Sequence, residues 1–346
     1  MKVATTFLCL LGFISFLAAS CDDCPTCPEQ TTEIEKHYKV YVAVTDGIEH
    51  GSWLYVLDIP ADTIIDSAAL SIGAMYIRVT PSGQKLYVLN IGGPNTVVYN
   101  SSDLSVDTTL DLAGDLFFDA SRNLGILVDA DGVHLFEPDD FAFRGHLPFQ
   151  CNYAFECIDT INGLLYGSQY DSIVYVIDYV NLELVDSLII GRKAVSSMLV
   201  VPEYDRLYFL SGGAFIYDLA EREITLGLSQ SQPYGSFARS SDGRYVYKCD
   251  PGRLFSGQYG SNLIWVYSVP DDSVIGYYST LVNDSQGYHY IDVANMPLTP
   301  DDKNLLATGS MDLALLRYDL NTGLATNVFA PFWPKVPLFF TIGEEI

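Results

Sequence analysis

The chain repeats one pattern about every forty residues, a period typical of a β-propeller, in which each repeat forms one blade around a central axis. Each copy has an apolar strand, a tight polar turn, a strand rich in Leu, Tyr and Val, and an aromatic or aliphatic run that ends in Asp. Clear copies lie at residues 84–90, 173–179 and 206–210. The repeat therefore constrains the fold far more than the chemistry.

Tight turns mark the junction between the first and second strands of the repeats. Six segments with Gly, Asp or Asn in the turn each precede a β-branched, Leu or Tyr strand: residues 80–83, 121–123, 160–163, 202–205, 240–243 and 299–302. These turns predict inner strands that begin at about Ala74, Asp115, Asn152, Ala194, Pro233 and Tyr288.

The two ends of the repeat region complete each other. Residues 38–72 supply only three strands, whereas an extra strand at residues 336–342 follows a complete last blade. Pairing the C-terminal strand with the first blade closes the ring and leaves no open central edge. The sequence therefore predicts an all-β fold over residues 38–346: a seven-bladed β-propeller with four antiparallel strands per blade, the first closed by the C-terminal strand.

Two segments resemble the YVTN family of bacterial propellers, which is related to lactonase-like and haem d1-binding propellers. They are Tyr87-Val88-Leu89-Asn90 and residues 174–191, and the resemblance extends over residues 38–343. Because these motif residues form strands and turns, the resemblance implies a fold and no particular activity. The strand tyrosines are predicted to pack between blades, among them Tyr55, Tyr87, Tyr175, Tyr208, Tyr217 and Tyr318.

The first twenty residues read as a signal peptide with a basic start, an apolar stretch and small residues before Cys21. Residues 17–21 resemble the lipobox of bacterial lipoproteins. The resemblance implies cleavage before Cys21, diacylglycerol on its sulfur and an acyl chain such as palmitate on its amine, which would anchor the chain to a membrane. Ordinary signal cleavage, with Cys21 left as a free or disulfide-bonded thiol, is the alternative.

Residues 21–37 are polar and contain Pro, as expected of a tether. Cys24 and Cys27 can form a local or intermolecular disulfide in an exported chain, and no second Cys or His pair follows them at zinc spacing. We expect neither a metal nor a cofactor. Asp22 resembles an inner-membrane retention signal, but this rule varies between bacterial groups. The inner membrane, the outer membrane and the cell surface therefore all stay open.

Acidic residues outnumber basic ones by 43 to 18, which gives a formal net charge of -25. This balance argues against nucleic-acid partners and against docking of the domain on anionic lipid. Calcium binding is an alternative use of the acids, but the densest group does not match the spacing of a calcium loop, and turn formation is favoured. That group is Asp129, Asp131, Glu137, Asp139 and Asp140.

Propellers usually bind ligands at the axis mouth, on loops that enter inner strands or join second to third strands. Residues 249–262 form an unusually long connection of this kind, rich in Gly yet holding Arg, Phe and Tyr. We expect a ring of aromatic and cationic residues to form a pocket for a sugar, peptide or acidic ligand, with an ordinary hydrated face as the alternative. The ring comprises His50, Tyr153, Lys193, Arg253, Tyr259, His289 and Trp333.

The chain has only five His and lacks the Gly-x-Ser-x-Gly, phosphate-loop, His-Glu-x-x-His and Cys-x-x-Cys-His motifs. We therefore assign no catalytic residue. The predicted function is non-enzymatic binding or scaffolding of a protein, peptide or glycan by a monomeric, lipid-anchored domain at the bacterial cell envelope. The alternative is a lactonase-like hydrolase that uses acids together with His50 and His289 at the axis mouth.

Overall fold

A computed structural model describes most of the repeat region, which lies in one compact unit, Lys36–Ile346. The described residues are 36–45, 52–70, 74–90, 96–111, 114–149, 157–168, 172–190, 195, 197–228, 235–250, 263–279, 281–284, 287–290, 293–309, 315–329 and 338–345. The predicted signal peptide and nearly all of the predicted tether, Cys21 included, lie outside these ranges.

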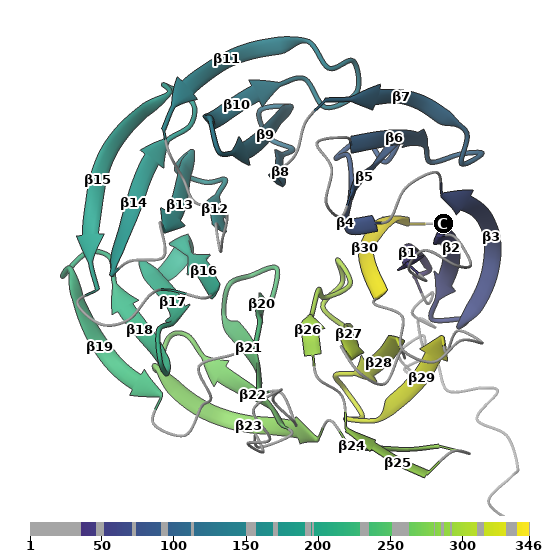
Figure 1. The fold of residues 1–346 in the computed structure, drawn as a ribbon. Helices are drawn as coiled ribbons and strands as arrows, with labels where there is room; N and C mark the ends of the chain where they lie inside the picture. The colour runs from purple at the N-terminus through teal and green to yellow at the C-terminus, as the bar shows by residue number, and fades with distance from the viewer. Residues whose placement is uncertain are drawn as a thin grey trace, which may run out of the picture. The chain divides into compact units, whose positions relative to one another are not determined.

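Seven four-stranded antiparallel sheets follow one another around a central axis (Figure 1). The fold is therefore the predicted all-β, seven-bladed propeller. The first three blades, each from its inner to its outer strand, are β30 (Leu338–Glu345), β1 (Tyr38–Thr45), β2 (Ser52–Ile59) and β3 (Thr63–Leu70); β4 (Ala74–Val79), β5 (Lys85–Asn90), β6 (Thr96–Asn100) and β7 (Val106–Leu110); and β8 (Asp115–Asp119), β9 (Leu124–Asp129), β10 (Gly132–Phe136) and β11 (Phe143–Pro148).

The other four blades have the same order. They are β12 (Cys157–Asp159), β13 (Leu164–Ser168), β14 (Ile173–Asp178) and β15 (Glu183–Ile189); β16 (Ser197–Val201), β17 (Arg206–Leu210), β18 (Ala214–Asp218) and β19 (Glu223–Leu228); β20 (Phe237–Arg239), β21 (Tyr245–Asp250), β22 (Leu263–Ser268) and β23 (Ser273–Ser279); and β26 (Val293–Asn295), β27 (Asn304–Gly309), β28 (Leu315–Asp319) and β29 (Ala325–Phe329).

Helix is nearly absent from the described residues, where it is limited to the 3-10 turn η1, Pro202–Tyr204. Within the same residues, no helix has the length and apolar content that a membrane crossing requires.

The C-terminal strand closes the ring as predicted. β30 pairs antiparallel with β1, with Phe340 opposite Val42 and Glu345 opposite Tyr38. The strand runs over Leu338–Glu345, slightly later than the predicted 336–342. The first blade therefore joins the two ends of the repeat region by backbone hydrogen bonds.

The predicted start of the last blade is wrong. Tyr288 lies in β25 (Gly287–Tyr290), which pairs with β24 (Leu281–Asp284) in a separate hairpin between blades six and seven. The inner strand of blade seven begins at Val293 instead. Alternating aromatic and polar residues suit either strand equally, so the pattern alone could not distinguish them. The predicted starts at Ala74 and Asp115 are confirmed, while Asn152, Ala194 and Pro233 lie outside the described residues.

Buried side chains fill the wedges between blades. In the described part of the chain they form seven clusters, each joining two neighbouring blades, so that every blade interface has one. Between blades two and three, for example, Tyr87 and Leu89 pack with Leu116, Leu127 and Phe136. Because each blade buries both faces in this way, its middle strands are mostly apolar and buried.

The strand tyrosines largely pack between blades, as predicted. Tyr87, Tyr208, Tyr217 and Tyr318 are buried, whereas Tyr55 and Tyr175 are partly buried. The outer strands are mostly exposed, as the residues of β3, β7 and β11 show.

The predicted turns between first and second strands form with a recurring geometry. In blade two, the Gly83 amide donates a hydrogen bond to the Thr80 carbonyl at 2.9 Å, and in blade six Gly243 donates in the same way to Ser240 at 3.0 Å. Both glycines have a φ near +70°, at 73° and 69°, which glycine adopts without the steric cost of a Cβ. These turns fix where each inner strand ends.

Candidate functional site

The inner strands β4, β20 and β30, together with the segment that directly follows β26, line a cavity of about 350 Å³ at the axis. Figure 1 shows these strands, β4, β20, β26 and β30, around the centre of the ring. The volume lies within the range of about 300–1,000 Å³ that is usual for small-molecule sites. The lining residues are Arg78, Phe237, Ala238, Arg239, Met296, Pro297, Leu298 and Thr341.

The cavity lies toward the end of the inner strands that carries the turns to the second strands. Arg239 directly precedes the turn at residues 240–243, and Leu298 directly precedes the turn at 299–302. The predicted ring of ligand-binding residues belongs to connections at the other end of the inner strands. The axial cavity is therefore a second candidate site, which the sequence did not indicate.

Arg78 supplies a cation on β4 and is partly buried. Its Nη1 donates a hydrogen bond to the Ile77 carbonyl at 2.9 Å, and its Cζ lies 5.8 Å from the centre of the Tyr76 ring. Burial lowers the pKa of the Arg78 guanidinium, while the Asp115 carboxylate and Tyr76 act in the opposite direction. Arginine nevertheless stays protonated in proteins, so Arg78 brings a positive charge to the cavity.

Arg78 differs from most of the other described arginines because it has no carboxylate partner within the described residues. Of these side chains, only Arg78 and Arg244 form no ion pair with an acid within the described residues, and Arg244 is exposed at a turn. The paired ones are Arg122 with Asp119, Arg144 with Glu137, Arg206 with Asp218 and Asp272, Arg222 with Asp186, Arg239 with Glu203, and Arg317 with Asp62.

The second cation of the cavity, Arg239, is partly neutralised. Its Nη1 lies 2.7 Å from Glu203 Oε2, which comes from the 3-10 turn of blade five. Behind the lining, Lys248 on β21 lies opposite Phe237 and is fully buried, and its Nζ donates to the Cys249 carbonyl at 3.4 Å. The described lining thus combines hydrogen-bond donors with apolar walls and contains no carboxyl or imidazole group.

A second cavity, of about 360 Å³, opens between the outer parts of blades two and three. Its walls are mainly apolar, with Leu110 from β7 and Phe136, Phe141 and Phe143 from blade three. Phe143 is 67% exposed. This cavity lies away from the axis, and its polar lining residues are Thr109, Asp111 and His134, with no Arg or Lys among the described lining.

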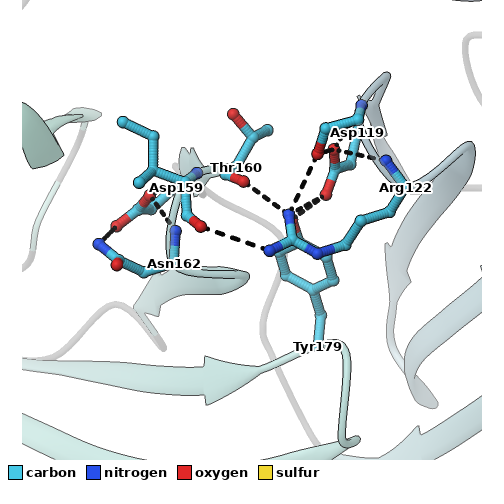
Figure 2. A network of polar contacts seen from close by, with 8 residues as sticks. Asp119, Arg122, Asp159, Thr160, Asn162 and Tyr179 are labelled. Carbon is cyan, nitrogen blue, oxygen red and sulfur yellow. Dashed lines mark hydrogen bonds and ion pairs between the residues drawn. The ribbon is translucent and has the colours of Figure 1, made fainter.

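A buried polar network joins blades three and four (Figure 2). Asp119 at the end of β8 is fully buried and accepts hydrogen bonds from Tyr179 Oη and Arg122 Nη1, both at 2.7 Å. The same Arg122 nitrogen donates to the Thr160 carbonyl of blade four at 2.6 Å. Burial of Asp119 opposes its ionisation, but hydrogen bonds from Ser121, Tyr179 and Arg122 outweigh it and lower its pKa.

This network connects blades three and four by hydrogen bonds and is not a ligand-binding site. Asp119 also accepts from the Ser121 amide, and the neighbouring turn repeats the arrangement around Asp159, which accepts two hydrogen bonds from Asn162. Figure 2 shows the carboxylate and guanidinium groups turned toward each other and toward backbone groups. Since these groups already have partners, the network is structural.

The acids of blade three form turns, as predicted. Asp129 Oδ1 accepts from the Asp131 amide at 2.8 Å and from the Gly132 amide at 3.1 Å, and Asp140 caps the Ala142 amide. His134 Nε2 lies 3.0 Å from Asp129 Oδ1 and stacks on His146 across the strand pair, with ring centres 4.4 Å apart. Among the described residues, no group of three His, Cys, Asp or Glu is placed to hold a metal ion.

The predicted ligand-binding residues lie almost entirely outside the described residues. This is so for His50, Tyr153, Lys193, Arg253, Tyr259 and Trp333. His289 has a described backbone, in β25, but its side chain is not described. The long connection that was expected to be functional does join β21 to β22, and its residues 251–262 also lie outside. The predicted ring therefore stays a prediction.

Comparison of the sequence with protein-family models and with curated proteins gave no match. The structure is similar to hydrazine synthase of Kuenenia stuttgartiensis, with 14% sequence identity over 73% of this chain and 78% of that chain and a TM-score of 0.59. It is also similar to a functionally unknown protein from Desulfotomaculum acetoxidans DSM 771, with 11% identity over 86% of this chain and 98% of that chain and a TM-score of 0.63. At such low identity the likeness extends to the fold alone, and the chain is a seven-bladed β-propeller.

Proposed function

We propose that this chain is an exported propeller of the YVTN type that binds a protein, peptide or glycan at its axis and leaves it chemically unchanged. The axial cavity is the observation that supports this role. Recognition needs orienting donors and apolar contact area, and the cavity provides both through Arg78, Arg239 and Phe237. General acid–base chemistry needs a carboxyl or imidazole group in the site, and the described lining contains neither.

The proposed setting is the bacterial cell envelope. Residues 1–20 direct export, Cys21 carries the lipid, and the tether up to residue 37 lets a monomeric propeller stand clear of the membrane. Lipid attachment keeps an acidic domain at a surface that would otherwise repel it, because the net charge of -25 opposes direct contact with anionic lipid.

Mass spectrometry of the N-terminal peptide from membranes tests the anchor. We expect the mature chain to begin at an acylated Cys21, and Cys21→Ser to abolish the lipid mass and release the protein from the membrane fraction. Cys24→Ser is the matched control, since it changes a thiol of the same tether without touching the acylated position. An unmodified mature N-terminus in the wild-type protein would contradict the proposed anchor.

An activity screen separates binding from the lactonase-like alternative. The purified protein should turn over no compound in a panel of lactones and esters. Turnover that is lost in His50→Ala or His289→Ala would establish a hydrolase with these residues in its site, and would end the proposal of a purely binding role.

A further inference from the structure

We infer that the axial cavity binds the C-terminal carboxylate of a peptide whose last side chain is apolar, with Arg78 as the group that holds the carboxylate. The inference rests on the proposed binding role and names the ligand chemistry of the same site. It starts from the contrast between Arg78 and the paired arginines of the later blades.

The guanidinium of Arg78 has unused donors. Its one hydrogen bond within the described residues goes to a neighbouring backbone carbonyl, and its other close contact is with the face of Tyr76. A guanidinium presents five N–H donors in a planar fork that matches the two oxygens of a carboxylate. In a chain where most described arginines pair with an acid, a partly buried arginine without one is suited to an acid that arrives with a ligand.

The charge around the cavity favours a single negative charge over a multiply charged group. The carboxylate of Glu203 already neutralises the charge of Arg239. The carboxylate of Asp115 has an electrostatic effect on Arg78 but forms no ion pair with it. The whole chain has a net charge of -25, which repels phosphate esters and other polyanions more strongly than it repels a monoanion. A carboxylate is the oxyanion that meets both conditions.

The walls favour a peptide over an acidic sugar. Phe237, Met296, Pro297 and Leu298 offer aromatic and aliphatic area, and Thr341 is the single hydroxyl side chain in the described lining. A sugar acid would place several hydroxyl groups against this apolar surface without enough partners, which is costly. An aliphatic or aromatic C-terminal side chain instead gains from burial there, while its carboxylate reaches Arg78.

A matched pair of probes tests the inference on the full mature chain in detergent micelles. N-acetyl-Ala-Leu with a free carboxylate and the same compound as its C-terminal amide have the same side chains and differ only at the terminal group. Each probe is also titrated into detergent without protein, which corrects for any partition into micelles. In isothermal titration calorimetry we expect the acid to bind about tenfold to hundredfold more tightly than the amide, as a charge-assisted hydrogen-bonded pair predicts.

Variants assign the preference to Arg78. Arg78→Gln should lower the affinity for the acid to that for the amide. Arg78→Lys should keep part of the preference for the acid, because lysine retains the positive charge but lacks the planar pair of guanidinium donors. Arg244→Gln is the matched control, because Arg244 is exposed and also forms no ion pair within the described residues. This substitution should leave the acid-to-amide ratio unchanged. If Arg78→Gln does not fold, as judged by its melting temperature, the reduced ratio in Arg78→Lys decides the test.

Other outcomes would overturn the inference. Equal affinity for acid and amide, an acid preference that survives in Arg78→Gln, or the absence of saturable binding by either probe would each do so. Binding of glucuronate that depends on Arg78, without binding of the peptide acid, would replace it with an acidic glycan. A negative binding result would overturn only the proposed peptide ligand, because neither peptide probe is a lactone and the experiment measures affinity. The proposed binding role and the lipid anchor are tested separately, by turnover in the activity screen and by the mass of the Cys21 peptide.

Discussion

At the scale of single residues, Gly125 leaves space in blade three for the aromatic ring of Phe136. Gly125 on β9 lies opposite Phe136 on β10, and the Phe136 ring lies 6.0 Å from the ring of Tyr87 in blade two. A Cβ at position 125 would lie 2.4 Å from Phe136 Cζ. The absent side chain thus makes room for an aromatic ring that fills the wedge between two blades.

Gly125→Ala should therefore lower the free energy of unfolding by about 1–3 kcal/mol, the usual cost of overpacking a filled core. Urea denaturation measures this, and Gly276→Ala on β23 is the control because a Cβ there meets nothing within 4 Å. The double variant Gly125→Ala with Phe136→Leu should lose less stability than the sum of the single variants, because the ring is the obstacle. Additive losses would contradict this explanation.

Single residues also show the limit of prediction from the sequence. The burial of Tyr87, Tyr208 and Tyr318 follows from their place in apolar strands and was predicted. Arg78 was not predicted as a site residue, because one arginine in a short strand looks like a solvent-facing side chain. Its strand was predicted as an inner strand, but only the arrangement of the blades brings Arg78 into one cavity with Phe237 and Thr341. An available signal was its position two residues before the turn at Thr80, close to the position that Arg239 occupies before Ser240.

At the scale of elements, the turn after β8 acts as a clamp on blade four. Tyr179 follows β14, and its hydroxyl donates to the fully buried carboxylate of Asp119 at 2.7 Å. Burial and this hydrogen bond raise the pKa of Tyr179, which keeps it protonated as a donor. Two elements that are far apart in sequence are thereby held by a charge-assisted hydrogen bond.

Tyr179→Phe should lower the free energy of unfolding at neutral pH by about 1.5–3 kcal/mol, the range for a hydrogen bond to a charged group. The pKa of Asp119 is lower in the folded state than in the unfolded state, where it is about 3.9. The ionised carboxylate therefore contributes fully to the free energy of unfolding above the unfolded pKa, and this contribution is lost as the pH falls through the folded pKa. The difference between wild type and Tyr179→Phe should therefore shrink in strong acid.

Urea unfolding at neutral pH and at successively lower pH measures this difference. Tyr175→Phe on β14 is the control, since the Tyr175 ring packs on Phe149 and no hydrogen bond of its hydroxyl is found within the described residues. If the loss of unfolding free energy in Tyr179→Phe stays the same in strong acid, the hydrogen bond to Asp119 is not its cause.

Strands and turns were predictable to different degrees. Hairpins with Gly or Asp turns, such as residues 80–83 and 240–243, are local in sequence, and their hydrogen bonds follow from a few residues. The hairpin of β24 and β25 was missed because its alternation is also that of an inner strand. Which of the two forms depends on neighbours that are distant in the chain.

At the scale of the whole molecule, the ring depends on a pairing between the two ends of the propeller. β30 lies between β1 and the axis, and it contributes Thr341 to the lining of the axial cavity. The number of blades was predictable from the six turns and the additional first blade, and the closure was predictable from the count of strands at the two ends. The loops that should form the predicted ligand site lie outside the described residues, so the predicted ring stays a prediction.

Deletion of residues 338–346 should abolish cooperative unfolding, because it exposes the inner edge of β1 and removes side chains that pack in the core. The free energy of unfolding of a whole domain is only about 5–15 kcal/mol, so the loss of one strand can exceed it. Thermal unfolding followed by circular dichroism measures this. A synthetic peptide of residues 336–346, added in trans, should restore a cooperative transition, whereas a scrambled peptide should not. A truncated chain that melts like the intact protein would contradict the role of β30.

The pairing of Tyr38 with Glu345 also orders events in time. Among the described strands, a ribosome makes β1 first and β30 last, so blade one lacks its inner strand until residues 338–345 have been made. Contacts between residues so far apart in sequence are slow to form, and the unfinished edge is open to wrong partners meanwhile. A copy that ends before residue 338 therefore lacks the inner strand of blade one, and we expect its exposed edge to attract chaperones and proteases.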